Sequence, residues 1–207
     1  MSRAHRVGRP GAAVAAVWLV GVVVLGLVIA HIVGGATAST TGATAAAAAG
    51  DPLGRIEAIP ADQRVAAAPI SGRLVGGGSY DPAAFAGHIV VVNAWGSWCT
   101  PCRTELPALR RLALARYASP VDFLGLDEEE GSMADGAAMA RQYQLPYRSI
   151  YDEDKSLYDA LAPLIAPSGV PGTVVIDARG RVAATVIGAV DEAALGTYLR
   201  QLAAHPG

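Results

Sequence analysis

Residues 89–102 have the sequence IVVVNAWGSWCTPC, a short apolar stretch that leads directly into two cysteines. The β-branched residues at its start predict a strand over 89–95 that is buried on both faces. Cys99 and Cys102 follow, and leucines at helical spacing continue through Arg116. We therefore expect the two cysteines at the junction between a buried strand and the N-terminus of a helix.

This position favours redox chemistry at Cys99. The N-terminus of a helix presents unpaired backbone N–H groups and about half a positive charge, which stabilise a thiolate. Pro101 suits the first turn because the N–H that it lacks would have no partner there. Cys102 is close enough to attack a mixed disulfide at Cys99 and release the substrate. A purely structural disulfide is the alternative, although so small a ring adds little stability.

Composition and charge exclude several other functions. The chain has 207 residues, 52% of them hydrophobic, and a formal net charge of −2. Lys155 is its only lysine, so no basic block is available to bind nucleic acid. Zinc would need two ligands beyond the cysteines, and covalent haem would need histidine where Arg103 stands. We expect no nucleic acid, no metal and no cofactor.

The N-terminus has the features of a membrane anchor. Residues 12–33 form an uncharged run of 22 residues, long enough as a helix to cross a bilayer. Three arginines precede it, so residues 1–11 are expected to be cytoplasmic and the rest extracytoplasmic, in a single-pass protein of the cell membrane. Residues 34–58 are expected to be a flexible linker, followed by one domain over 59–204. The alternative is a signal peptide cleaved near Ala38, with secretion of the remainder.

The pattern in residues 59–204 predicts a mixed α/β sheet covered by helices. The acidic run at 127–130 is interpreted as a solvated loop that follows a strand. Asp191 is the expected N-cap of the last helix. The other expected elements are a strand at 121–126, a helix at 134–143, a strand at 147–151, a helix at 155–161 and a hairpin of 173–177 with 181–187.

Residues 91–107, VVNAWGSWCTPCRTELP, resemble the TlpA/ResA-like membrane-anchored branch of the thioredoxin superfamily. Members of that branch share the form N-x-W-x-x-W-C-x-P-C-x-x-E-x-P, and the resemblance extends over residues 59–202. It implies a thioredoxin fold with an N-terminal extension and a helix-strand insert between residues 132 and 151, preceded by one transmembrane helix. Gly172 departs from the threonine that relatives often carry, which leaves the fit of the substrate open.

The resemblance also implies the site residues. Cys99 is the attacking thiolate and Cys102 is the resolving thiol. Pro171 is expected in the cis form beside them, where the backbone of Val170 pairs with an extended substrate segment. Trp98 is a further candidate for the surface that contacts the substrate.

Glu105 has two interpretations. It follows Cys102 by three residues on the same helical face and resembles the acidic residue that this family keeps beside the cysteines. In that position a carboxylate can carry the proton of the recessed Cys102 thiol. The alternative is an acid that faces solvent in the first turns of a helix, where the helix dipole favours it.

The resemblance implies a membrane-tethered, extracytoplasmic thiol-disulfide oxidoreductase that reduces protein disulfides. Apocytochrome c during cytochrome c maturation is the leading substrate, and a transmembrane thiol transporter is the implied electron donor. The alternative is a disulfide-forming oxidase for secreted proteins, because the exchange reaction is reversible. A copper-binding chaperone has less support, since such relatives use a wider cysteine spacing and a distal histidine.

Overall fold

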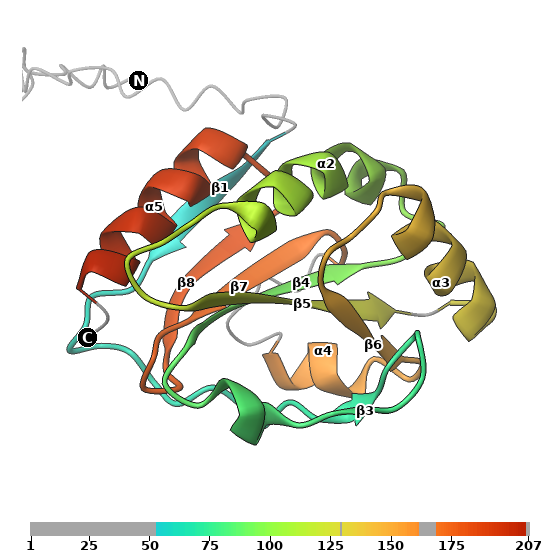
Figure 1. Ribbon diagram of the computed structural model, residues 1–207, viewed down its shortest axis with the longest axis horizontal. Coiled ribbons are helices and arrows are strands. Elements are labelled where there is room, and N and C mark those ends of the chain that lie inside the picture. The colour runs from blue at the N-terminus through green and yellow to red at the C-terminus, as the bar shows by residue number, and fades with distance from the viewer. Residues whose placement is uncertain (1–52, 129, 162–168, 206–207) are drawn as a thin grey trace, which may run out of the picture. The chain divides into compact units, whose positions relative to one another are not determined.

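The structure is a computed structural model that describes residues 53–128, 130–161 and 169–205. These residues belong to one unit of the chain, Ala49–Gly207. Seven of the described strands form one mixed sheet in the order β6-β5-β4-β7-β8-β1-β9, and β2 pairs with β3 in a separate hairpin (Figure 1).

The elements predicted between residues 89 and 204 are all present, with ends that differ by one or two residues. The strands are β1 (Leu53–Ala58), β2 (Gly72–Arg73), β3 (Ser79–Tyr80), β4 (Ile89–Trp95), β5 (Val121–Glu128), β6 (Arg148–Asp152), β7 (Gly172–Ile176), β8 (Val182–Ile187) and β9 (Ala189–Val190). The helices are the 3-10 turn η1 (Pro82–Phe85), α2 (Thr100–Leu114), α3 (Met133–Gln142), α4 (Ser156–Leu161) and α5 (Glu192–Ala204).

Strand β4 lies at the centre of the sheet, and all of its residues are buried. It runs parallel to β5 and antiparallel to β7, where Ala94 is the partner of Gly172. Successive side chains point to opposite faces, so Val91 and Trp95 join one hydrophobic cluster while Val92 and Ala94 join the other. The prediction of a strand buried on both faces is confirmed.

Helices α2, α3 and α5 cover one face of the sheet, and α4 lies on the other side (Figure 1). Leu106 and Leu109 of α2 and Leu199 of α5 are fully buried in the cluster between helices and sheet. The side chain of Asp191 accepts a hydrogen bond from the backbone N–H of Ala194 at 2.7 Å, so the expected N-cap of α5 is present.

The N-terminal side of the sheet differs from the expected linker over residues 34–58. Residues 53–58 form β1, which pairs antiparallel with β8 and, at its start, parallel with β9. Glycine at position 54 permits this close approach, because a Cβ there would lie 2.3 Å from the carbonyl oxygen of Ile187. The sheet therefore begins before residue 59.

The predicted cytoplasmic segment 1–11, the predicted anchor 12–33 and the linker up to residue 52 lie outside the described residues. In the part of the chain that the structure describes, no helix has the length and apolar character needed to cross a membrane. The anchor over 12–33 therefore stays a prediction from the sequence.

The interpretation of residues 127–130 as a solvated loop was wrong for the three of them that the structure describes. Asp127 and Glu128 are the last residues of β5 and are 0% and 1% exposed, and Glu130 is 7% exposed. The strand continues this far because its neighbours continue beside it, with Asp127 paired to Trp95 on β4 and to Tyr151 on β6. Asp127 and Glu128 are thus buried within the strand ladder, and Glu130 is buried against Ser97.

Candidate functional site

Cys99 and Cys102 lie at the junction between β4 and α2. They are joined by a disulfide with their Cα atoms 5.3 Å apart, inside the ordinary range for such a bond. Cys102 is fully buried, whereas Cys99 retains 3% of its exposure. The structure therefore places both predicted cysteines at the predicted junction, with Cys102 recessed.

Cys99 is the N-cap of α2. Its Sγ accepts a hydrogen bond from the backbone N–H of Cys102 at 3.1 Å, and Pro101 occupies the first turn. The first N–H groups of a helix favour negative charge at this position. In the reduced protein the same geometry therefore stabilises a thiolate on Cys99.

Pro171 lies at the same edge of the sheet as the cysteines. The Val170–Pro171 peptide bond is cis. Gly172 follows it and pairs with Ala94 near the end of β4, just before the segment that carries the cysteines. Pro171 is buried and Val170 is half-buried against both hydrophobic clusters, so the backbone at this point borders the site.

The two tryptophans near the cysteines have different roles in the structure. Trp95 is 0% exposed and belongs to the core, whereas Trp98 is 52% exposed. The Trp98 indole Nε1 donates a hydrogen bond to the carbonyl oxygen of Glu128 at 3.0 Å. A Cβ at Gly96 would lie 2.6 Å from that nitrogen, so only glycine leaves room for the ring. Trp98 is thus a fixed apolar surface beside Cys99.

Ile187 is a candidate substrate-contact residue that the sequence analysis missed. It ends β8 as the partner of Gly172, and it is 42% exposed. The next residue, Gly188, donates its backbone N–H to the carbonyl oxygen of Pro171 at 3.0 Å. An apolar residue at the last position of a predicted hairpin strand was the available signal, but the strand order is needed to place it near Pro171.

Glu105 is 1% exposed, so the interpretation as a solvent-facing acid was wrong. Its Oε1 accepts from Asn93 Nδ2 at 2.8 Å and its Oε2 accepts from the backbone N–H of Val190 at 2.8 Å. It faces the sheet because it shares a helical face with Cys102 and Leu109. Burial raises the pKa of the Glu105 carboxyl to about 7, and the two hydrogen bonds oppose that shift.

The Glu105 carboxyl is expected to titrate near pH 7 instead of near 4.5. Its side-chain carbon resonance in glutamate-labelled protein, followed by NMR from pH 4 to 9, gives the midpoint directly. The Glu105→Gln variant identifies the signal, since that titration disappears from its spectrum while the other glutamate resonances remain. Glutamate resonances that all titrate below pH 5.5 would contradict the expected pKa.

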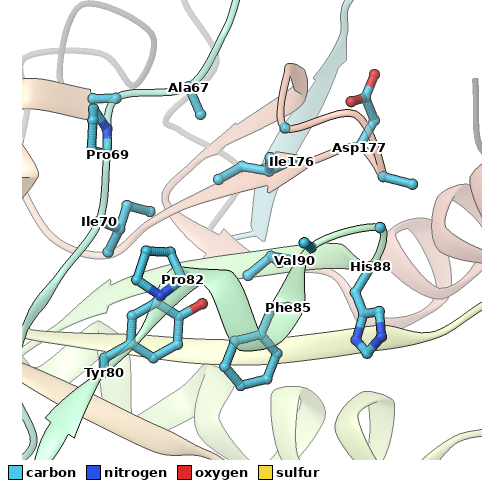
Figure 2. A pocket seen from close by; sticks show the side chains of 15 residues that line it. Ala67, Pro69, Ile70, Tyr80, Pro82, Phe85, His88, Val90, Ile176 and Asp177 are labelled. Carbon is cyan, nitrogen blue, oxygen red and sulfur yellow. The ribbon is translucent and has the colours of Figure 1, made fainter.

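An apolar cavity of about 200 Å³ lies away from the cysteines. Ile70, Tyr80, Phe85 and Val90 are among the residues that line it (Figure 2). Val90 stands near the start of β4, and the cysteines follow its other end, so roughly 15 Å of strand separate Val90 from the end that leads to the cysteines. Among the described residues, no group of three or more His, Cys, Asp or Glu side chains is arranged to hold a metal ion.

A mixed sheet between helices, with a Cys-x-x-Cys pair at a helix N-terminus and a cis-proline at the same sheet edge, defines a thioredoxin-like domain. The chain belongs to the AhpC/TSA family, whose model matches residues 66–185. The matched region contains both cysteines, Glu105 and Pro171.

Relatives of known name confirm the resemblance to ResA-like proteins. The chain is 28% identical over 116 residues to "Thiol-disulfide oxidoreductase ResA" of Bacillus cereus, which covers 56% of this chain and 64% of that protein. It is 33% identical over 107 residues to "Thiol:disulfide interchange protein DsbE" of Pseudomonas fluorescens biotype C, covering 51% of this chain and 55% of that protein. The chain thus spans less than two thirds of the length of these relatives.

Solved structures share the fold. A DsbF homologue from Corynebacterium diphtheriae matches with a TM-score of 0.65 and 27% identity, over 71% of this chain and 92% of that chain. A secreted thiol-disulfide isomerase from Corynebacterium glutamicum matches with a TM-score of 0.65 and 24% identity, over 72% and 92%. At that identity the second match supports the fold alone.

Proposed function

We propose that the protein is a thiol-disulfide oxidoreductase in which Cys99 and Cys102 alternate between a dithiol and a disulfide. The observation that carries the proposal is the disulfide at the N-terminus of α2, with the Cys102 N–H bound to the Cys99 sulfur. A helix N-terminus is where a thiolate is stabilised, and the thiolate is the form that attacks disulfides. The names of the relatives describe the same reaction class.

In the reducing direction the Cys99 thiolate attacks one sulfur of a substrate disulfide. A bond forms between Cys99 and that sulfur, and the other substrate sulfur leaves as a thiolate that takes up a proton. Cys102 then loses its proton and attacks the Cys99 sulfur, which releases the second substrate thiol and closes the Cys99–Cys102 disulfide. Two electrons pass from the protein to the substrate, and the opposite direction uses the same steps in reverse.

Glu105 is proposed to accept the proton of Cys102 in the resolving step. Cys102 is fully buried and has no direct access to bulk water, so its proton needs a nearby acceptor. Glu105 lies one turn further along the same face of α2, and a carboxyl whose pKa is about 7 exchanges protons near neutral pH.

The substrate is proposed to bind over Trp98, Val170 and Pro171. Trp98 and Ile187 provide exposed apolar side chains, and the cis-proline segment lies at the same edge of the sheet. An extended segment around a substrate disulfide can pair with the backbone of Val170 while its side chains contact these apolar groups. A protein disulfide, rather than a small disulfide, is therefore the proposed substrate.

We also propose that the protein reduces disulfides outside the cytoplasm while tethered to the cell membrane. The apolar run at 12–33, the arginines before it and the likeness to ResA and DsbE support this arrangement. Reduction in that compartment needs electrons from a membrane thiol transporter, and apocytochrome c is the proposed substrate on the family resemblance.

A disulfide-forming oxidase is the second candidate, and the N-cap contact favours it. Any interaction that stabilises the Cys99 thiolate stabilises the reduced form and makes the disulfide a stronger oxidant. The buried Glu105 acts in the opposite sense, because a carboxylate disfavours a thiolate near it. A copper chaperone has no comparable support, since Cys-x-x-Cys differs from the wider spacing of such relatives.

The reduction potential distinguishes the two directions. We expect the full-length protein in detergent, equilibrated with dithiothreitol and glutathione buffers, to show a reversible two-electron couple. A potential of about −270 mV or lower supports the reductase, and one of about −120 mV supports the oxidase. Cys99→Ser is the blank, and wild-type protein without any couple would contradict the proposed function.

A further inference from the structure

Ser97, two residues before Cys99, is bound through all of its polar groups. Its backbone N–H donates to the carboxylate of Glu130, and its Oγ donates to the other oxygen of that carboxylate at 2.6 Å. Its carbonyl oxygen accepts from Arg103 Nη2 at 2.6 Å. The orientation of Ser97 is thus fixed from the end of β5 on one side and from α2 on the other.

Trp98 is held by the same part of the chain. Its indole N–H donates to the carbonyl oxygen of Glu128, two residues before Glu130, and its ring lies against Gly96. The ring is nevertheless 52% exposed. A large apolar side chain is therefore kept in one place while it faces solvent, beside the attacking cysteine.

Glu130 is only 7% exposed, which is unusual for a charged side chain. Burial of a carboxylate costs free energy unless donors compensate for the lost water. The backbone N–H and the hydroxyl of Ser97 are donors to this carboxylate, and charge-assisted bonds of this kind are strong. The hydrogen bonds between Glu130 and Ser97 therefore help to fix the position of the segment before Cys99.

We propose that Glu130 is a positioning residue for protein substrates, which keeps Trp98 in its exposed orientation by fixing Ser97. This inference rests on the proposed thiol-disulfide exchange and adds a determinant of substrate binding. The bond from the Cys102 N–H to the Cys99 sulfur lies within the first turn of α2 and does not involve Glu130. Loss of Glu130 therefore weakens the reaction with a protein disulfide and spares the reaction with a small one.

The test compares two probes on the full-length protein: insulin, reduced in a dithiothreitol-coupled assay, and the small disulfide 5,5′-dithiobis(2-nitrobenzoate). Glu130→Ala is expected to lower kcat/KM for insulin about tenfold, mainly through KM, and to change the rate with the small disulfide less than about twofold. Glu130→Gln keeps an acceptor for Ser97 and is expected to lose less than about threefold. Glu153→Ala, at an exposed acid, is the matched control and is expected to match wild type.

Two further variants test whether Glu130 acts through its neighbours. Trp98→Ala is expected to lower kcat/KM for insulin and to leave the rate with the small disulfide nearly unchanged. Adding Glu130→Ala to Trp98→Ala is expected to lower kcat/KM for insulin by less than about a further twofold, because the effects of coupled residues are not additive. Ser97→Ala, which removes only the hydroxyl bond, is expected to lose about threefold on insulin. Ser97→Ala keeps the test decisive if Glu130→Ala fails to fold.

Three outcomes overturn the proposal. In the first, Glu130→Ala or Ser97→Ala reduces insulin as fast as wild type. In the second, both probes slow by the same factor, which assigns Glu130 a purely structural role. In the third, the losses of Glu130→Ala and Trp98→Ala multiply in the double variant, so the two residues act independently. Wild-type protein that reacts with neither probe would instead contradict the proposed function.

Discussion

Cys99→Ser is expected to lower the rate of insulin reduction by at least about a thousandfold, because the variant has no thiolate at the helix N-terminus. Cys102→Ser is expected to stop turnover at a different step. Its Cys99 thiolate still attacks, but no second thiol is present to break the mixed disulfide. The physical basis is the asymmetry of the pair: Cys99 caps α2 and keeps some exposure, whereas Cys102 is fully buried.

Mass spectrometry after incubation with an oxidised peptide measures this difference. Cys102→Ser is expected to accumulate a covalent adduct on Cys99 that dithiothreitol removes, and wild-type protein to show only a trace. The double variant Cys99→Ser/Cys102→Ser is the control for non-specific labelling. An adduct on Cys102 in the Cys99→Ser protein, with none in Cys102→Ser, would reverse the assigned roles.

The centre of the fold was predictable because local signals there agree with one another. Residues 89–95 are β-branched and apolar, and the strand they form is buried on both faces. Cys99 and Pro101 follow at positions suited to a helix N-terminus, and the helix begins there. When pattern, cap and turn residues indicate the same element, a single sequence is enough to locate it.

The rest of the sheet depends on contacts that the local sequence does not contain. Strand β1 is short, comes soon after a Gly- and Ala-rich tract in the sequence, and gains its hydrogen bonds from β8, far away in the chain. Residues 127–130 carry four acidic residues, which usually indicates solvent, yet β4 pairs with β5 as far as Asp127 and β6 pairs with it as far as Glu128. A run of acidic residues usually indicates exposed side chains, but pairing between strands determines whether a given side chain is buried.

The positions of the two cysteines were predictable, and the surroundings of the site were less so. The position of Glu105 on α2 left its environment open, and only the packing of that helix on the sheet buries it against Asn93 and Val190. Likewise Ile187 approaches Pro171 through strand order, and Glu130 approaches Ser97 across a loop. Each of these contacts joins residues far apart in the chain, which helical or strand periodicity does not reveal.

Asp127→Asn is expected to stabilise the folded protein by about 2 kcal/mol or more at pH 8, although the changed residue is fully buried. Among the described residues, no donor hydrogen-bonds to either carboxylate oxygen of Asp127, and helix α3 packs directly on it at Gly136. Burial raises the pKa of Asp127 from 3.8 to about 9. The negative charge of Glu130 and a hydrogen bond with it, followed by the charges of Glu128 and Asp135, contribute to the same shift. The folded protein therefore holds a proton on Asp127 at neutral pH.

The sign of the pH dependence follows from that raised pKa. Between about pH 4 and 9 the folded state binds a proton at Asp127 that the unfolded state has lost, so this group lowers the free energy of unfolding as pH rises. Asparagine has the shape of the protonated acid and does not ionise in either state. The free energy of unfolding of the variant therefore does not fall with pH through this residue. Urea unfolding at pH 4.5 and pH 8 should show a gain that is small at the lower pH and large at the higher one. Asp62→Asn, at an exposed acid, is the matched control, and a destabilised Asp127→Asn at pH 8 would show that Asp127 is ionised and bound in the folded protein.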